Sequence, residues 1–164
     1  MQAIRTTRKS GFTLVEILIV VIILGILAAI VIPQFTNASQ DARRSSLQST
    51  VQTLRSQISL YKLQHHDTTP VLATFWDQLS QYTDDTGDAQ AAKDATHIYG
   101  PYVQTIPNNG MVPTAAASVV IAAATNPPVA ADADGTQAYF YDATSGKVWA
   151  AGKDDDGNYI IIGE

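Results

Sequence analysis

The fold of this chain is decided by the stretch Gly11-Phe12-Thr13-Leu14-Val15-Glu16, which joins a basic leader to a long apolar run. The leader carries Arg5, Arg8 and Lys9, and the run extends from Phe12 to Ile32. Glu16 is the only ionisable side chain in that run. A carboxylate inside a membrane-length segment costs roughly 2.5 to 3.5 kcal/mol on insertion scales. We therefore expect Glu16 to be paired or to lie outside the hydrocarbon, and the segment to do more than anchor a domain.

The apolar run predicts the first half of one long helix. Residues 17–24 are apolar on every side, and the run is about long enough to span a bilayer. Gly25 and Pro33 interrupt it, and Pro33 should kink or loosen the helix because proline lacks a backbone donor and clashes with the preceding turn. Since nothing else signals a stop, we expect the helix to continue to about Leu63.

The second half of this helix shows a different pattern, with apolar residues on one side only. They recur at spacings of three and four in an otherwise polar sequence, which is typical of a helix that packs on a sheet. These residues are Leu47, Val51, Leu54, Ile58 and Tyr61. Arg43, Arg44 and Arg55 fall off the stripe, and we expect them on a solvated face.

The remaining residues, from Asp67 onward, predict a small globular head. Pro, Gly, Asp and Thr become frequent there, so the helix should end, frayed, near His65 and His66. A short helix is expected within 74–82, and a loop or weak helix within 84–94. Apolar or alternating stretches predict strands at 118–124, 138–141, 147–151 and 159–162. Short turns such as 144–146 and 155–158 favour an antiparallel meander lying on the apolar stripe.

Residues 9–33 closely resemble the N-terminus of the type IV pilin and pseudopilin superfamily. This resemblance implies that a prepilin peptidase cleaves the Gly11–Phe12 bond and that the new N-terminal Phe12 is N-methylated. Glu16 then becomes the fifth residue of the mature chain. A second segment, Tyr99 to Gly110, resembles part of the head of major pseudopilins of the type II secretion G kind.

Together these observations predict an α+β fold: a long N-terminal helical spine, membrane-spanning in its first half, packed against a small C-terminal antiparallel sheet, a pilin-like lollipop. The expected divisions are a cleaved leader at 1–11, a transmembrane and filament-core helix at 12–35, an amphipathic half at 36–66 and a head at 67–164.

The amino-acid composition argues against two classes of function, nucleic-acid binding and catalysis. The whole chain holds 10 Lys and Arg against 15 Asp and Glu, and loss of the three leader cations leaves a net charge near −8. Such a balance argues against nucleic-acid binding, which needs clustered cations. The chain has no Cys, and no nucleophile–base arrangement or phosphate-binding glycine pattern is present. We therefore expect no catalytic residues and no enzyme activity.

Metal and cofactor binding is not expected either. His65 and His66 are adjacent and point to different helix faces, which disfavours a shared ligand role. The acidic stretch 154–158 is a calcium candidate because closely spaced oxygens suit calcium, but it lacks the spacing and the terminal bidentate Glu of an EF-hand, and we interpret it as a hairpin tip. The loop 132–135 is a weaker calcium candidate. The Asp-Pro-Trp-Gly-like motif that accompanies calcium in major pseudopilins is missing, so we assign no metal ligands.

The favoured function is a filament subunit. Glu16 of an arriving copy would meet the Phe12 ammonium of its neighbour, which pairs two charges in a low-dielectric core and sets the register. That partner is implied by the resemblance, since an intrachain pair at the same spacing and a simple membrane-boundary position for Glu16 both stay open. An ordinary secretory signal cleaved after Ala29 is a further alternative, disfavoured because the apolar run continues beyond it.

Partners and location follow from the same reasoning. The expected partners are further copies of the chain, prepilin peptidase, the secretion or pilus machinery, and membrane lipid. The basic leader predicts a cytoplasmic N-terminus and a periplasmic head at the bacterial inner membrane, before the chain enters a filament. A type II secretion pseudopilus is favoured over a surface pilus. A singly anchored envelope protein whose head binds a ligand is the alternative from another class.

Overall fold

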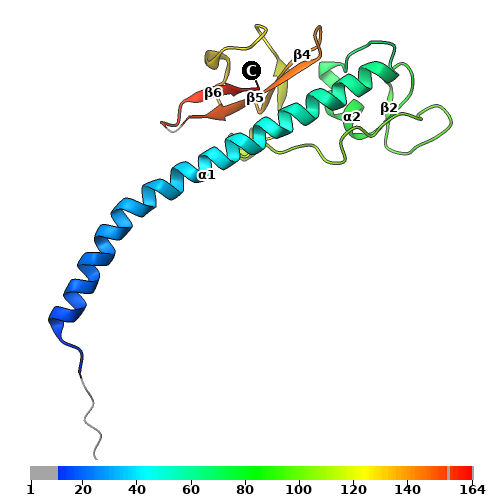
Figure 1. Ribbon diagram of the computed structural model, residues 1–164. Coiled ribbons are helices and arrows are strands. Elements are labelled where there is room, and N and C mark those ends of the chain that lie inside the picture. The colour runs from blue at the N-terminus through cyan, green and yellow to red at the C-terminus, as the bar shows by residue number, and fades with distance from the viewer. Residues whose placement is uncertain (1–10, 155, 164) are drawn as a thin grey trace, which may run out of the picture. The chain divides into compact units, whose positions relative to one another are not determined.

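The computed structural model describes residues 11–154 and 156–163. One long helix, α1 (Leu14–Gln64), precedes a head built of short helices and two small sheets (Figure 1). The chain separates into two compact units, one ending at Ser39 and one beginning at Gln40. The α+β class predicted from the sequence, with a long helix and a small sheet, is confirmed.

Helix α1 begins and ends close to the predicted residues, for local reasons. Its sequence contains no internal capping signal, and helical backbone runs without interruption through Gly25 and Pro33. The predicted kink at these two positions stays a prediction. The helix ends where His66 and Asp67 adopt positive φ angles of 53° and 64°, and the Asp67 N–H donates to the Lys62 carbonyl at 2.8 Å. Such left-handed residues close a helix C-terminus.

The second unit has its core between α1 and the sheet. All five stripe residues are buried, none more than 5% exposed, which confirms the pattern read from the sequence. They form one cluster with the buried strands β4 (Tyr139–Asp142) and β5 (Lys147–Lys153). Aromatic rings of the short helix α2 (Phe75–Ser80) complete it, with the Phe75 and Tyr141 ring centroids 4.6 Å apart. The 3-10 turn η1 (Leu72–Thr74) leads into α2.

The main sheet has the order β3-β4-β5-β6, where β3 is Val120–Ala122 and β6 is Tyr159–Ile162. The pairs β4–β5 and β5–β6 are antiparallel, as predicted. Gly146 makes the first of these hairpins, with φ of 73° and its N–H donating to the Asp142 carbonyl at 2.8 Å. A residue with a side chain rarely adopts this φ, so glycine suits the turn.

The predicted meander is wrong for β3, which pairs with β4 in parallel. Parallel neighbours need a connection of a dozen or more residues. The chain between Ala122 and Tyr139 is that long and contains the 3-10 turn η3 (Ala130–Asp132), so β4 can start again from the same end of the sheet as β3. A further 3-10 turn, η2 (Thr114–Ala116), precedes β3.

A second, two-stranded sheet lies in a region expected to be loop or weak helix. Strands β1 (Tyr82–Thr83) and β2 (Ala89–Gln90) pair antiparallel, and Thr83 also bridges to Tyr99. Gln78 supports this hairpin from α2, because its amide donates to the Gly87 carbonyl at 2.7 Å. The short strands carry no hydrophobic alternation, so local sequence gave no strand signal.

Candidate functional site

The Gly11–Phe12 bond lies just before α1, in exposed chain without helical hydrogen bonding. Phe12 is 77% exposed, and, apart from its chain neighbours, no atom of the described residues lies within 4 Å of the position where Gly11 would carry a side chain. The bond therefore lies in exposed backbone outside the helix. The leader residues before Gly11, with their three cations, lie outside the described residues.

Glu16 and Thr13 form a reciprocal cap at the start of α1. The Thr13 N–H and Oγ1–H donate to Glu16 Oε2 at 2.9 and 2.7 Å, and the Glu16 N–H donates to Thr13 Oγ1 at 3.3 Å. This is the capping box of Thr-x-x-Glu sequences, which satisfies two backbone donors that a helix start leaves open. Sequence reasoning singled out Glu16 and missed Thr13, although the three-residue spacing was visible.

The cap gives Glu16 a partner inside its own chain and still leaves one oxygen free. Both of its hydrogen bonds from Thr13 end on Oε2. Oε1 accepts none from residues 11–154 and 156–163. Negative charge is also favoured at a helix N-terminus because the peptide dipoles add up there. Glu16 can therefore hold the helix start and present a carboxylate oxygen to a second cation at once.

The apolar residues that follow are exposed on every side of α1. Large side chains from Leu14 to Ile32 are 39 to 81% exposed. In the described chain one helix, α1, is long and apolar enough to cross a membrane by length and composition. Its most apolar window has no buried residue, unlike the core helix of a soluble domain.

In the second unit, Arg44 and Arg55, both expected on a solvated face, are half-buried and bind the head instead, whereas Arg43 stays exposed as expected. Arg55 Nε donates to the Val148 carbonyl at 3.0 Å, and its Nη2 donates to the Gly163 carbonyl. Arg44 donates to the Lys153 carbonyl at 3.0 Å. Arg43 makes a longer, exposed bond of 3.3 Å to the Gly110 carbonyl. These acceptors are far away in sequence, so no local pattern marks them.

His65 is a core residue rather than part of a frayed end. It is 1% exposed and its ring stacks on Tyr61 at 3.8 Å. Its Nδ1 lies 2.8 Å from the Tyr61 carbonyl and its Nε2 lies 3.0 Å from Thr83 Oγ1. A carbonyl only accepts, which places a proton on Nδ1. Both ring nitrogens are used, so the expectation that His65 is no metal ligand agrees with its contacts.

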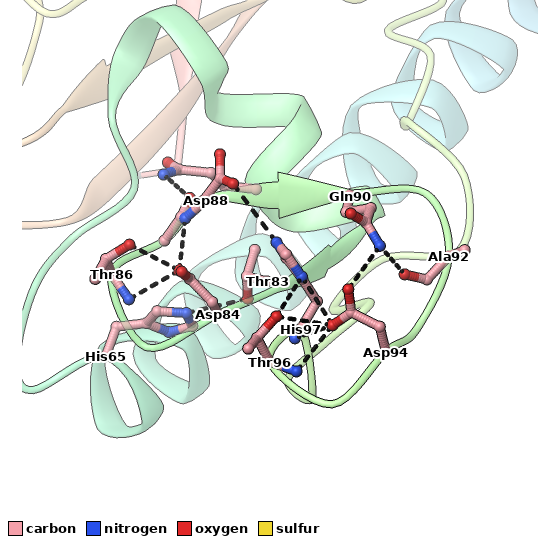
Figure 2. A network of polar contacts seen from close by, with 12 residues as sticks. His65, Thr83, Asp84, Thr86, Asp88, Gln90, Ala92, Asp94, Thr96 and His97 are labelled. Carbon is pink, nitrogen blue, oxygen red and sulfur yellow. Dashed lines mark hydrogen bonds and ion pairs between the residues drawn. The ribbon is translucent and has the colours of Figure 1, made fainter.

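His97 joins Asp94 of its own loop to Asp88 of the turn between β1 and β2 (Figure 2). Its Nδ1 lies 3.0 Å from Asp94 Oδ1, and its Nε2 lies 3.5 Å from Asp88 Oδ2. The hydrogen bond to Asp94 raises the pKa of His97, and hydrogen bonds from the His97 N–H and ring lower the pKa of Asp94. Asp94 also accepts from the Thr96 N–H and hydroxyl. These groups tie the loop to the hairpin β1–β2.

The two calcium candidates use their carboxylates in their own turns. Asp154 Oδ1 accepts the N–H groups of Asp156 and Asn158 at 3.0 and 2.8 Å. Asp134 Oδ1 accepts the N–H and hydroxyl of Thr136. Among the described residues, no group of three or more His, Asp or Glu side chains could hold a metal ion. The stretch between β5 and β6 is the expected acidic hairpin turn, whereas Asp134 and Gly135 lie in the connection that leads from η3 to β4.

Comparison with known proteins places the similarity in the N-terminal third. Residues 6–32 match the prokaryotic N-terminal methylation motif. Type II secretion system core protein G of Pseudomonas aeruginosa is 41% identical over 56 residues, 34% of this chain and 39% of the relative. The same protein of Escherichia coli is 34% identical over 61 residues, 37% of this chain and 42% of the relative.

A pilus protein is similar over the same region. Type IV narrow pilus major component PilA5 of Thermus thermophilus is 37% identical over 57 residues, 35% of this chain and 49% of the relative. The match therefore spans less than half the length of each of these relatives. No solved structure gives a significant match. The family model covers residues 6–32, and each of these relatives matches about a third of this chain.

Proposed function

We propose that this chain, whose N-terminal third carries the motif of the type IV pilin and pseudopilin superfamily, is a non-enzymatic subunit of a type II secretion pseudopilus. Its similarity to several secretion core proteins supports this assignment over that segment. Prepilin peptidase cleaves Gly11–Phe12, and the exposed, non-helical backbone there suits this step. Methylation of the new Phe12 amine follows from the same motif.

The observation that carries the proposal is Glu16 at the start of an otherwise apolar, exposed helix. Before assembly, α1 is anchored in the inner membrane and its apolar side chains contact lipid. The leader cations keep the N-terminus in the cytoplasm and the head enters the periplasm. In the filament, other copies of α1 replace the lipid, and the free Oε1 of Glu16 pairs with the Phe12 ammonium of a neighbouring copy.

The capping box makes this role testable, because Gln can replace Glu in a cap but carries no charge. In Glu16→Gln the helix start should be preserved and assembly lost. In Glu16→Ala both should be lost. Both variants should still be cleaved at Gly11. Filaments sheared from cells and measured against total subunit report assembly, and hydrogen exchange of the Leu14 to Leu18 amides reports the cap.

The control is Thr13→Val, which removes the cap hydroxyl and keeps the acid. It should weaken protection of the first turn and retain filaments. Normal filament yield from Glu16→Gln together with a loss from Glu16→Ala means that the residue serves only as a cap. The charge-pairing mechanism is then wrong.

A surface pilus is the second candidate, favoured by the similarity to a narrow pilus component. The two functions differ in what deletion of the gene removes. A pseudopilus subunit is required for export of secreted proteins to the medium, and a pilin is required for surface fibres. Export that stays normal in the deletion strain, with fibres lost, favours the pilus.

A further inference from the structure

In the second unit, α1 passes β5 (Figure 1). A cationic pocket lies there, lined by residues of both elements. It has a volume of about 410 Å³ and is lined by six residues from four parts of the chain. Arg55 comes from α1, and Lys147 and Trp149 come from β5. Asn126 and Pro127 come from the connection after β3, and Gly163 follows β6. The pocket therefore joins two positive charges, an indole and an amide.

Within the described chain, the two cations of this pocket have no acid partner. No carboxylate lies within 4 Å of Arg55 or Lys147 among residues 11–154 and 156–163. Two of the five N–H groups of Arg55 donate to the carbonyls of Val148 and Gly163, and its guanidinium lies 5.6 Å from the Trp149 ring centroid. The side chain is fixed in place with donors to spare.

The nearest acid along the register is already used. Asp142 is the partner of Lys147 in the β4–β5 pairing. Its carboxylate accepts hydrogen bonds from Ser145 Oγ at 2.7 Å, the Thr144 N–H at 2.9 Å and Asn126 Nδ2 at 2.6 Å. These bonds lower the pKa of Asp142 and occupy it in the turn. It does not neutralise the pocket by direct contact.

We propose that this pocket binds a carboxylate, supplied by an acidic side chain of a second copy of this chain. A fixed guanidinium beside an ammonium suits a carboxylate, because the planar fork binds two oxygens and the lysine adds a point charge. The source follows from charge complementarity. The chain as a whole has net charge −5, with 15 Asp and Glu against 10 Lys and Arg, so carboxylates outnumber cations. Between copies packed in a filament, electrostatic attraction is strongest where an acidic side chain of one copy lies in this pocket of another.

The identity of the occupant, a second copy of the chain, rests on the proposed filament function. The binding of a carboxylate by the pocket does not. The first experiment therefore needs no filament. Sodium glutarate is titrated into the cleaved full-length chain in detergent micelles, with sodium chloride at equal ionic strength as the reference. The chain has two tryptophans. The Trp149 indole NMR signal should shift, and that of Trp76, whose N–H donates to the Ser118 carbonyl at 2.7 Å, should not.

Two matched variants separate the pocket from general charge effects. Lys147→Gln should weaken glutarate binding about two- to fivefold, the range for an exposed ion pair. Lys93→Gln, at another exposed lysine, should leave it unchanged. A Trp149 signal that responds equally to chloride and glutarate overturns the carboxylate site.

The second experiment tests the occupant in cells that assemble the filament. Lys147→Glu should reduce filament yield at least about fivefold, because like charges meet at the contact. Lys93→Glu should assemble as the parent chain does. Thermal unfolding of both variants checks the fold, and Lys147→Gln should show a smaller defect in the same direction.

These experiments distinguish a failure of the pocket proposal from a failure of the proposed filament function. A parent chain that forms no filament defeats the proposed function, and the glutarate titration still decides the pocket. A parent chain that assembles, with Lys147→Glu assembling equally well, overturns the second copy as occupant. If glutarate then still binds, the pocket serves a free carboxylate ligand.

Discussion

The two halves of α1 place their apolar side chains in opposite ways. From Leu14 to Ile32 every large apolar side chain is at least 39% exposed, whereas the stripe from Leu47 to Tyr61 is at most 5% exposed. Helical geometry is the same in both halves. The difference lies in what each half packs against, because the stripe is covered by the head and the first half is covered by nothing in the described chain. In the described chain, only the second half of α1 buries its apolar side chains.

The largest expected effect contrasts one leucine from each half. Leu54→Ala should reduce the free energy of unfolding of the second unit by about 2 to 5 kcal/mol, because it leaves a cavity in the core. Leu24→Ala should leave that free energy unchanged, since Leu24 is 57% exposed. Denaturant unfolding in micelles, followed by fluorescence of buried Trp149, measures both. Equal losses from the two variants contradict the division between the halves.

A smaller effect is expected from the arginines that join α1 to the head. Arg55→Met should cost about 1 to 3 kcal/mol of unfolding free energy, because the carbonyls of Val148 and Gly163 lose their donor. Arg43→Met, at an exposed bond of 3.3 Å, should cost less than about 0.5 kcal/mol. The same unfolding measurement applies. If Arg55→Met is as mild as Arg43→Met, the arginine is solvated as the sequence first indicated.

The smallest expected effect is a pH dependence of the second unit that the first unit should not show. The pKa of His97 is raised by its hydrogen bond to Asp94, with Asp88 and Asp84 adding to the negative field. A histidine whose pKa is higher in the folded than in the unfolded state stabilises the folded state. This stabilisation is complete below the unfolded pKa, about 6.5 for His, and is lost as the pH rises through the folded pKa. Loop 84–98 should therefore open more readily above about pH 6.5.

Hydrogen exchange at pH 5.5 and 8.5, corrected for intrinsic rates, measures this opening. Protection of amides 84–98 should fall at the higher pH in the parent chain and change little in His97→Gln. Amides 15–32, which have no histidine near them in sequence, serve as the internal reference. A pH response that persists in His97→Gln assigns the effect to another group.

Local patterns predicted the parts of the fold that local forces determine. The helix, its buried stripe and the hairpins β4–β5 and β5–β6 follow from periodicity and turn residues. The parallel pairing of β3 did not follow, because it depends on the path of a long connection. His65 was read as frayed because its burial comes from Thr83 and Tyr99, well beyond the helix end.

The same division holds for the candidate sites. Gly11, Phe12 and Glu16 belong to one contiguous motif and are predicted as sites from the sequence, and the Thr13 cap is equally local. Arg55 and Lys147 lie 92 positions apart in the numbering and meet only through the packing of α1 on β5. Nothing in either neighbourhood marks them as a pair. The pocket that they line could be identified only from the three-dimensional structure.

The most direct test of the central claim is the intact mass of the chain isolated from a host with prepilin peptidase. We expect one mature species that begins at Phe12, with the added mass of one methyl group on its amine. A species that begins at Ile30, after the alternative signal-type site, would show that the apolar run is a discarded secretory signal and would contradict both the anchor and the filament core.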